Sequence, residues 1–168
     1  RLIREPPVYP RMDATADELA GVVDLFGGLT RAELERALSE AAYRADGQSV
    51  DGDALEVALE EARSSFALLE YDRADGDPLL VAGPTAFPTV PAHAEDVPHI
   101  LDVERRRLDR DALGEQARVE FQDAVDDAVA ASEDTTRLHD LLDISYDIEA
   151  WAPVDLADER DRLEAAIE

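Results

Sequence analysis

Apolar residues recur three and four positions apart in three segments of the first third of the chain, which predicts three amphipathic helices. Each segment follows a capping box, in which Thr or Asp precedes Glu by three residues. The three boxes are Thr15 with Glu18, Thr30 with Glu33, and Asp53 with Glu56. The apolar faces are expected to bury together. The predicted centre of this core consists of Phe26, Leu38, Leu59 and Phe66.

The hydrophobic period then changes from helical to strand-like. Residues 67–72 (ALLEYD) and 79–82 (LLVA) are typical of two short strands, and the turn-rich residues 73–78 join them. Three helices followed by a β-hairpin is the element order of a winged helix-turn-helix, in which the hairpin is the wing. Residues 12–82 are therefore predicted to form a winged-helix-like unit.

Four prolines block regular helix over much of residues 83–108, which we interpret as a proline-rich connector. Its apolar residues indicate that it packs across a surface of the protein. They are Phe87, Val90, Val97, Ile100 and Leu101.

Residues 109–168 are predicted to form a helical carboxy-terminal part. We expect a long helix over 109–131 and a shorter one over 135–142. Apolar and polar residues alternate over 144–149, which favours an extended segment there, and a last helix follows Asp155. The predicted fold is therefore mainly α with a small β-hairpin, a winged helix-turn-helix-like unit followed by helices.

Residues 1–11, with three arginines and three prolines, are interpreted as an extension or arm before a natural start at Met12.

The 168 residues include 41 acidic and 16 basic side chains, for a formal net charge of −25. All basic side chains are arginine, and cysteine is absent. This composition excludes a Walker A loop, Schiff-base chemistry, a thiolate nucleophile and cysteine zinc sites.

The acids are dispersed along the chain, and their mutual repulsion would be screened in molar salt, where the Debye length is ~3 Å. We interpret this charge as halophilic adaptation. A nucleic-acid mimic or a chaperone of basic proteins, the competing interpretation, would favour one concentrated acidic run.

Several blocks of the sequence are distinctive: DELAGVVDLFGGLTRAELERAL, LLVAGPTAFPTVP, DVPHILDV and LLDISYDIEAWAPVDL. On these blocks the chain from Met12 onward resembles a family of small acidic proteins that is found across haloarchaea and has no assigned function. The resemblance implies a halophilic, cytoplasmic protein, and it implies no catalytic residue.

Five arginines are candidate contacts to phosphate or nucleic acid: Arg63, Arg73, Arg105, Arg106 and Arg107. Arg63 lies on the third predicted helix, which would enter a DNA groove but carries four carboxylates against this one arginine. Arg105–Arg107, together with Arg110, form the one local basic cluster, at the start of the long helix. They could bind phosphate, or they could pair with Glu104, Asp109 and Asp111 beside them. We expect Arg63 and Arg73 to lie apart from this cluster.

The remaining candidate chemistry predicts no site. His93 and His99 flank two carboxylates, but their spacing matches no zinc motif, so we predict neither a metal nor a cofactor. No nucleophile elbow or glycine-rich phosphate loop is present, and we predict that the protein is not an enzyme.

We therefore expect a non-enzymatic protein-interaction module of a halophilic archaeal cytoplasm, with a protein partner and no membrane association. The alternative is a winged-helix DNA-binding transcriptional regulator. The identity of the partner and the oligomeric state stay open.

Overall fold

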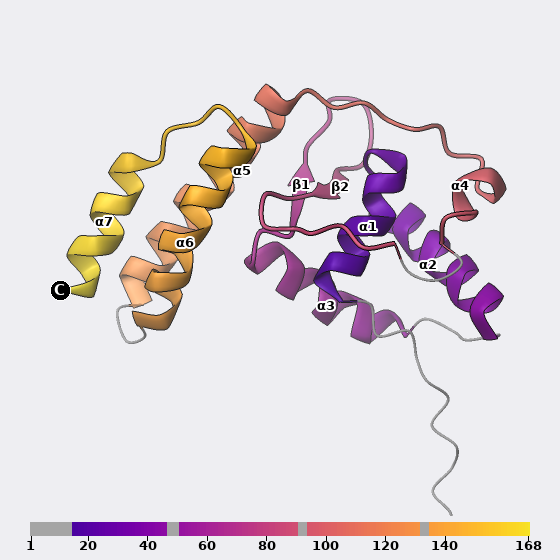
Figure 1. Ribbon diagram of the computed structural model, residues 1–168, viewed down its shortest axis with the longest axis horizontal. Helices are drawn as coiled ribbons and strands as arrows, with labels where there is room; N and C mark the ends of the chain where they lie inside the picture. The colour runs from indigo at the N-terminus through magenta and orange to yellow at the C-terminus, as the bar shows by residue number, and fades with distance from the viewer. Residues whose placement is uncertain (1–14, 47–50, 91–93, 132–134) are drawn as a thin grey trace, which may run out of the picture.

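The computed structural model describes residues 15–46, 51–90, 94–131 and 135–168. The predicted extension over residues 1–11 and the start at Met12 lie outside these ranges. The described chain is mainly helical, with one small antiparallel sheet (Figure 1). Its elements in order are α1 (Ala16–Phe26), α2 (Arg31–Asp46), α3 (Gly52–Ser64), β1 (Leu68–Tyr71), β2 (Leu79–Ala82), α4 (Val97–Ile100), α5 (Arg110–Ala131), α6 (Thr135–Trp151) and α7 (Ala157–Ile167).

Side-chain capping determines where the first three helices begin. The Glu18 amide donates a 3.2 Å hydrogen bond to the Thr15 hydroxyl, and the Thr15 amide donates to the Glu18 carboxylate. The second predicted box is also formed, at the start of α2. For α3 the prediction is wrong by two residues, because Asp51 is the cap and accepts a 3.0 Å hydrogen bond from the Asp53 amide. Both aspartates can cap a helix, and the chain uses the earlier one.

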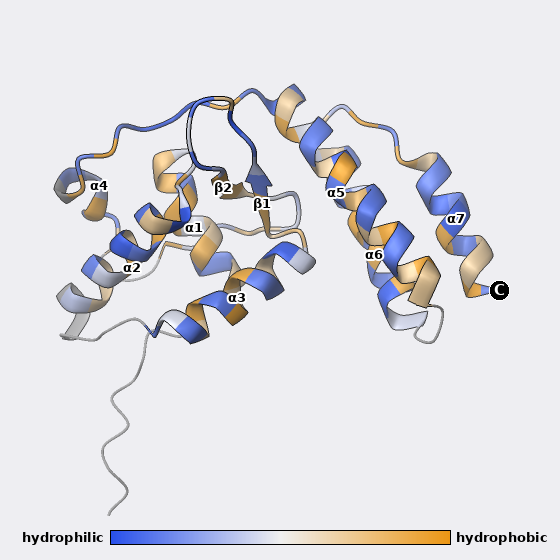
Figure 2. Ribbon diagram, turned by 180° about the vertical axis from the view of Figure 1, so that it is seen from behind, coloured by the Kyte–Doolittle hydropathy of each residue, from blue (hydrophilic) through white to orange (hydrophobic). Residues whose placement is uncertain are grey.

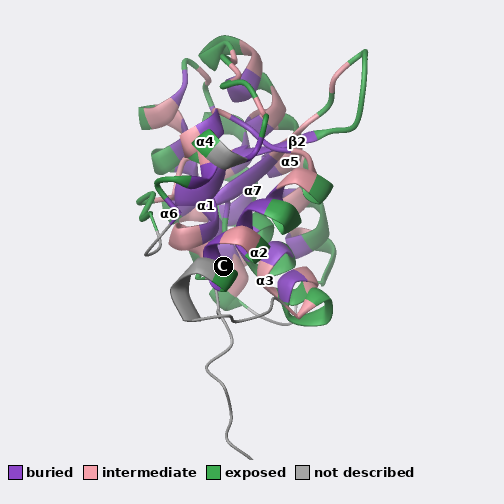
Figure 3. Cartoon of the chain, turned by 90° about the vertical axis from the view of Figure 1, so that its right-hand side faces the viewer, coloured by how far each residue is buried: buried purple, intermediate pink, exposed green. Residues whose placement is uncertain are grey.

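The predicted hairpin is confirmed. β1 and β2 pair antiparallel, with Leu68 opposite Ala82 and Tyr71 opposite Leu79. Leu29, between α1 and α2, adds an isolated bridge to Leu80 through backbone N···O distances of 3.0 and 2.7 Å. The turn between the strands projects from the body of the molecule (Figure 3).

The carboxy-terminal part consists of α5, α6 and α7 packed against one another (Figure 1). The long helix is confirmed, but α6 continues to Trp151, so the extended segment predicted over 144–149 is wrong. Leu141, Ile144 and Ile148 are buried at helical spacing on this one helix. A six-residue alternation fits either period, and packing against α5 and α7 selects the helix.

Both faces of the hairpin are buried, and its side chains divide between two clusters. Leu68 and Leu80 pack with the residues of α1–α3, whereas Leu69, Leu79 and Val81 pack with those of α5–α7. Successive strand residues point to opposite faces of a sheet, so the two strands can serve both clusters at once. The helices themselves carry hydrophobic and hydrophilic stripes (Figure 2).

Within the described ranges, no helix combines the length and apolar character needed to cross a lipid bilayer.

The core predicted from the sequence is therefore split. Phe26, Leu38 and Leu59 lie in the first cluster as predicted, but Phe66 belongs to the second. The ring of Phe66 meets that of Phe121 edge to face, with 5.9 Å between centroids. Phe66 has a φ of 65°, at the point where the chain leaves α3 for β1, and helical periodicity does not extend through such a bend.

We expect Phe121→Ala to destabilise the protein by about 3–5 kcal/mol, because it leaves a cavity beside Phe66 in a fully buried position. Urea denaturation in molar KCl measures the change. Val119→Ala on the same helix is the control, since Val119 is 43% exposed and its truncation should stay within about 0.5 kcal/mol. Equal effects of the two substitutions would contradict the placement of this core.

Candidate functional site

The loop of residues 83–90, which we call the anchored loop, is held to the body of the protein at its start. The Gly83 amide donates to the Ala67 carbonyl at 2.8 Å. Thr85 donates through its hydroxyl to the Ser65 carbonyl at 2.8 Å and through its amide to the Phe66 carbonyl at 3.2 Å. These bonds continue the hairpin beyond β2 and fix the direction in which the loop leaves it.

The far end of the anchored loop is held by α1. The Thr89 amide donates to the Asp17 carbonyl at 3.0 Å, and the Phe87 amide donates to the Asp17 carboxylate at 3.1 Å. Gly21 permits this contact, because a Cβ there would lie 2.1 Å from the Thr89 carbonyl oxygen. Both ends of the loop are thus fixed by hydrogen bonds to backbone carbonyls, and the far end is also fixed by the carboxylate of Asp17 in the first turn of α1.

The side chain of Phe87 is 80% exposed, although the backbone on both sides of it is held. Val90 is also exposed, whereas Val97 and Leu101 of the same connector are buried. The expectation that these apolar residues pack on the protein surface is therefore correct for Val97 and Leu101 and wrong for Phe87 and Val90, and the side chain of Ile100 lies outside what the structure describes. Apolar composition could not separate these two pairs, because the hydrogen bonds of the loop decide which way its side chains point.

Arg106 joins the connector to the amino-terminal helices. Its amide donates to the Phe26 carbonyl at 2.7 Å, and its guanidinium donates to the Gly28 carbonyl at 2.9 Å. The same guanidinium binds both carboxylate oxygens of Glu33, at 2.7 and 3.1 Å. The hydrogen bond from Arg106 lowers the pKa of Glu33 from 4.5 to about 2, with smaller contributions from Thr30 and against the opposing effect of burial.

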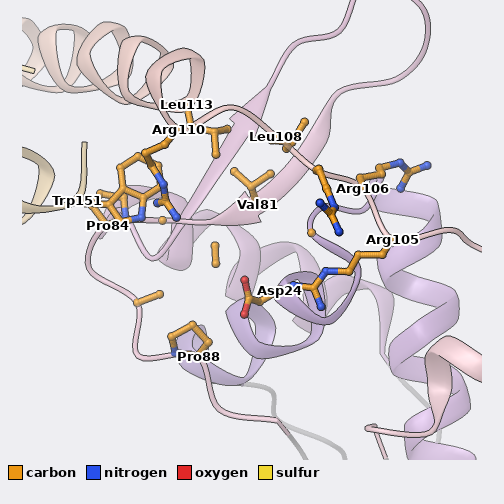
Figure 4. Close-up of a pocket in the computed structure, with 15 residues that line it drawn as sticks. Asp24, Val81, Pro84, Pro88, Arg105, Arg106, Leu108, Arg110, Leu113 and Trp151 are labelled. Atoms are coloured by element: carbon orange, nitrogen blue, oxygen red, sulfur yellow. The ribbon is translucent and has the colours of Figure 1, made fainter. Parts of the chain in front are cut away.

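Arg106 is therefore a structural residue, and its neighbours line an open cleft. This cleft, which we call the arginine cleft, has a volume of about 740 Å³ and lies between the end of α1, the residues from β2 into the anchored loop, and the start of α5 (Figure 4). Its basic residues are Arg105, Arg106, Arg107 and Arg110. The guanidinium of Arg110 lies 4.2 Å from the ring centroid of Trp151.

Glu104, Asp109 and Asp111, which lie beside this cluster in the sequence, form no ion pair with it. Among the described residues, no ion pair joins Arg105, Arg107 or Arg110 to any carboxylate, including the neighbouring acids predicted to pair with them. Asp24 carries the single carboxylate among the described residues that line the cleft, and Figure 4 shows it on the same side as Arg105.

The other two candidate arginines lie outside the cleft lining, and each has a partner of its own. Arg63 forms ion pairs with Glu70 of β1 at 2.9 Å and with Glu120 of α5 at 3.1 Å. Burial raises the pKa of Glu120, and the bond from Arg63 partly offsets that effect. Arg73 donates to the Asp77 carbonyl within the hairpin turn, at 3.0 Å.

The candidate metal ligands in the connector are His93 and His99. His93 lies outside the described residues, and His99 is exposed at the end of α4. In the part of the chain that the structure describes, no group of three or more acidic or histidine side chains is arranged to hold a metal ion.

The comparisons with known proteins give one result. The model of DUF7109, a family of unknown function, matches residues 17–168, and the chain belongs to this family. No curated protein and no solved structure matches the chain significantly. This membership agrees with the predicted resemblance to a family without an assigned function. It assigns no role to any residue.

We expect Glu33→Gln to destabilise the protein by about 2 kcal/mol at pH 7. Glutamine can keep the capping bond to Thr30 but loses the charge that faces Arg106. Because the folded-state pKa of Glu33 is depressed, the stabilisation is present above pH 4.5 and is lost as the pH falls from 4.5 to about 2. Urea unfolding of both proteins at pH 7 and near pH 2 measures this convergence. Glu35→Gln, an exposed charge on the same helix, is the control, and an equal loss there would contradict the role of the pair.

Proposed function

We propose that this protein is a non-enzymatic protein-interaction module of a halophilic archaeal cytoplasm, and that Phe87 is its principal contact residue. The observation that carries the proposal is the 80% exposure of Phe87 on a loop whose backbone is hydrogen-bonded on both sides. The occupant we propose is a partner protein with an apolar pocket that accepts the aromatic ring.

Burial of an aromatic ring in an interface is favourable, because it removes a large apolar area from water. Buried aromatic anchors account for a large part of the binding energy in many protein interfaces. A loop that is already ordered loses little conformational entropy on binding, so its contact residue contributes more to affinity. The bonds from Thr85 and from the Phe87 amide supply this preorganisation.

We further propose that residues 15–82 form a winged-helix-like unit. The order of α1, α2, α3 and the hairpin supports this. The bridge from Leu29 to Leu80 also supports it, because it pairs the segment between α1 and α2 with β2. In a DNA-binding member of this fold, α3 would face the nucleic acid. The ion pairs of Arg63 with Glu70 and Glu120 remove the one positive charge of α3 from that task, which favours the protein partner over DNA.

We expect Phe87→Ala to reduce capture of the partner at least tenfold, because the anchor of the interface is removed. The measurement is quantitative cross-linking of the tagged full chain in haloarchaeal extract at molar KCl, with and without nuclease. Tyr43→Ala is the matched control, since Tyr43 is an aromatic residue that is 73% exposed on α2.

Two results would contradict this proposal. Equal capture by the two variants would remove Phe87 from the interface, and a complex that disappears with nuclease would favour the DNA-binding alternative. Light scattering of the purified chain distinguishes a separate partner from a second copy of this protein.

The halophilic assignment rests on the net charge of −25 and yields a separate prediction. We expect the melting temperature to rise as KCl increases from ~0.1 M to ~2 M, because the Debye length falls from ~10 Å to about 2–3 Å and the acidic side chains repel one another less. Circular dichroism measures the transition. Sucrose is the control, since it stabilises by exclusion without screening charge. An unchanged melting temperature in KCl would remove the assignment.

A further inference from the structure

Three guanidinium groups that line the arginine cleft form no ion pair with any described residue, in a chain that has 41 acidic side chains for 16 basic ones. Within the described ranges, Arg105, Arg107 and Arg110 form no ion pair, and all three line the arginine cleft. Elsewhere Arg31, Arg118 and Arg162, although partly exposed, do pair with acids. Arg36, Arg73 and Arg137 also form no ion pair among the described residues, but they lie outside the cleft lining, so the cleft is the place that gathers three unpaired guanidinium groups.

These arginines also lie at or just before the start of α5. Arg110 is within its first turn, where the positive end of the helix dipole disfavours a cation. An anion in the cleft would be attracted both by the guanidinium groups and by the start of a 22-residue helix.

Most of the other residues that line the cleft are apolar. The accessible apolar part of the lining comes from Pro84, Pro88 and Leu108, whereas Val81 and Leu113 are buried behind it, and Trp151 lies beside Arg110 at one end (Figure 4). A volume of about 740 Å³ falls within the range of ~300–1,000 Å³ that small-molecule sites occupy. An inorganic ion would leave most of this surface uncovered.

We propose that the arginine cleft binds a phosphorylated organic molecule of the nucleotide class. The guanidinium groups of Arg105, Arg107 and Arg110 hold the phosphate groups, and arginine suits this task because its planar fork matches phosphate oxygens. The apolar surface and Trp151 take the organic part. Asp24 is placed to accept a hydrogen bond from a ligand hydroxyl, which a bare phosphate does not have.

The site is independent of the proposed protein interface. Phe87 is not among the residues that line the cleft, although Ala86 and Pro88 on either side of it are. Loss of Phe87 should therefore leave ligand binding unchanged, and the two proposals can fail separately.

The single tryptophan of the chain, Trp151, provides the measurement. We expect ATP to change its fluorescence saturably in the full-length protein at 0.5 M KCl, with calorimetry as a second readout. Inorganic pyrophosphate should bind more weakly than ATP, because it lacks the organic part, and adenosine should bind more weakly still, because it lacks the charge. Affinity for ATP should fall when KCl is raised to 2 M.

The variant that tests the arginines is Arg105→Gln/Arg107→Gln, which should weaken ATP binding at least tenfold through the loss of charge-assisted hydrogen bonds. Arg36→Gln/Arg137→Gln removes the same charge from two arginines outside the cleft lining and should bind ATP like the parent protein.

Three outcomes would overturn the proposal. They are ATP binding no tighter than adenosine, equal weakening by the two double variants, and a glutamate-rich peptide binding where ATP does not. The first and third need only the parent protein, so the proposal stays testable even if a variant does not fold.

Discussion

A two-stranded hairpin with both faces buried is the constraint on which the rest of this structure depends. Leu68 and Leu80 belong to the cluster of α1–α3, and Leu69, Leu79 and Val81 belong to that of α5–α7. Eight strand residues therefore hold two groups of helices together. The hairpin supplies one row of leucine or valine side chains to the core of each group. Without these rows, the apolar faces of the helices in each group would be exposed to water.

This arrangement forces the connector to pass around the amino-terminal helices before α5 can pack on the other face. The bidentate pair between Arg106 and Glu33 holds the returning chain against α2, while the anchored loop holds the departing chain against α1. The arginine cleft lies between these two segments. Its shape is thus a consequence of how one chain enters and leaves a shared sheet.

The two proposed binding features use this shared framework in different ways. Phe87 extends an apolar ring outward from a fixed loop, which suits a protein partner. Arg105 and Arg107 concentrate positive charge in a concave place on an otherwise acidic protein, which suits a small anion. In molar salt long-range electrostatic attraction is weak. Affinity then depends on short-range contacts, such as an aromatic ring buried in a pocket or a guanidinium group hydrogen-bonded to phosphate.

The sequence alone determined α1, α2, α3, α5 and α7, the hairpin and the dispersed acidic charge, because capping boxes and hydrophobic periods are local signals. It did not predict that 144–149 is helical or that Phe66 joins the second cluster, since six alternating residues fit two periods and a bend with φ of 65° interrupts the pattern. It located the basic cluster at Arg105–Arg107 but not its surroundings. Which arginine pairs with Glu33, and which apolar side chain of the connector faces water, was decided only by tertiary structure, because these contacts join residues 70 or more positions apart.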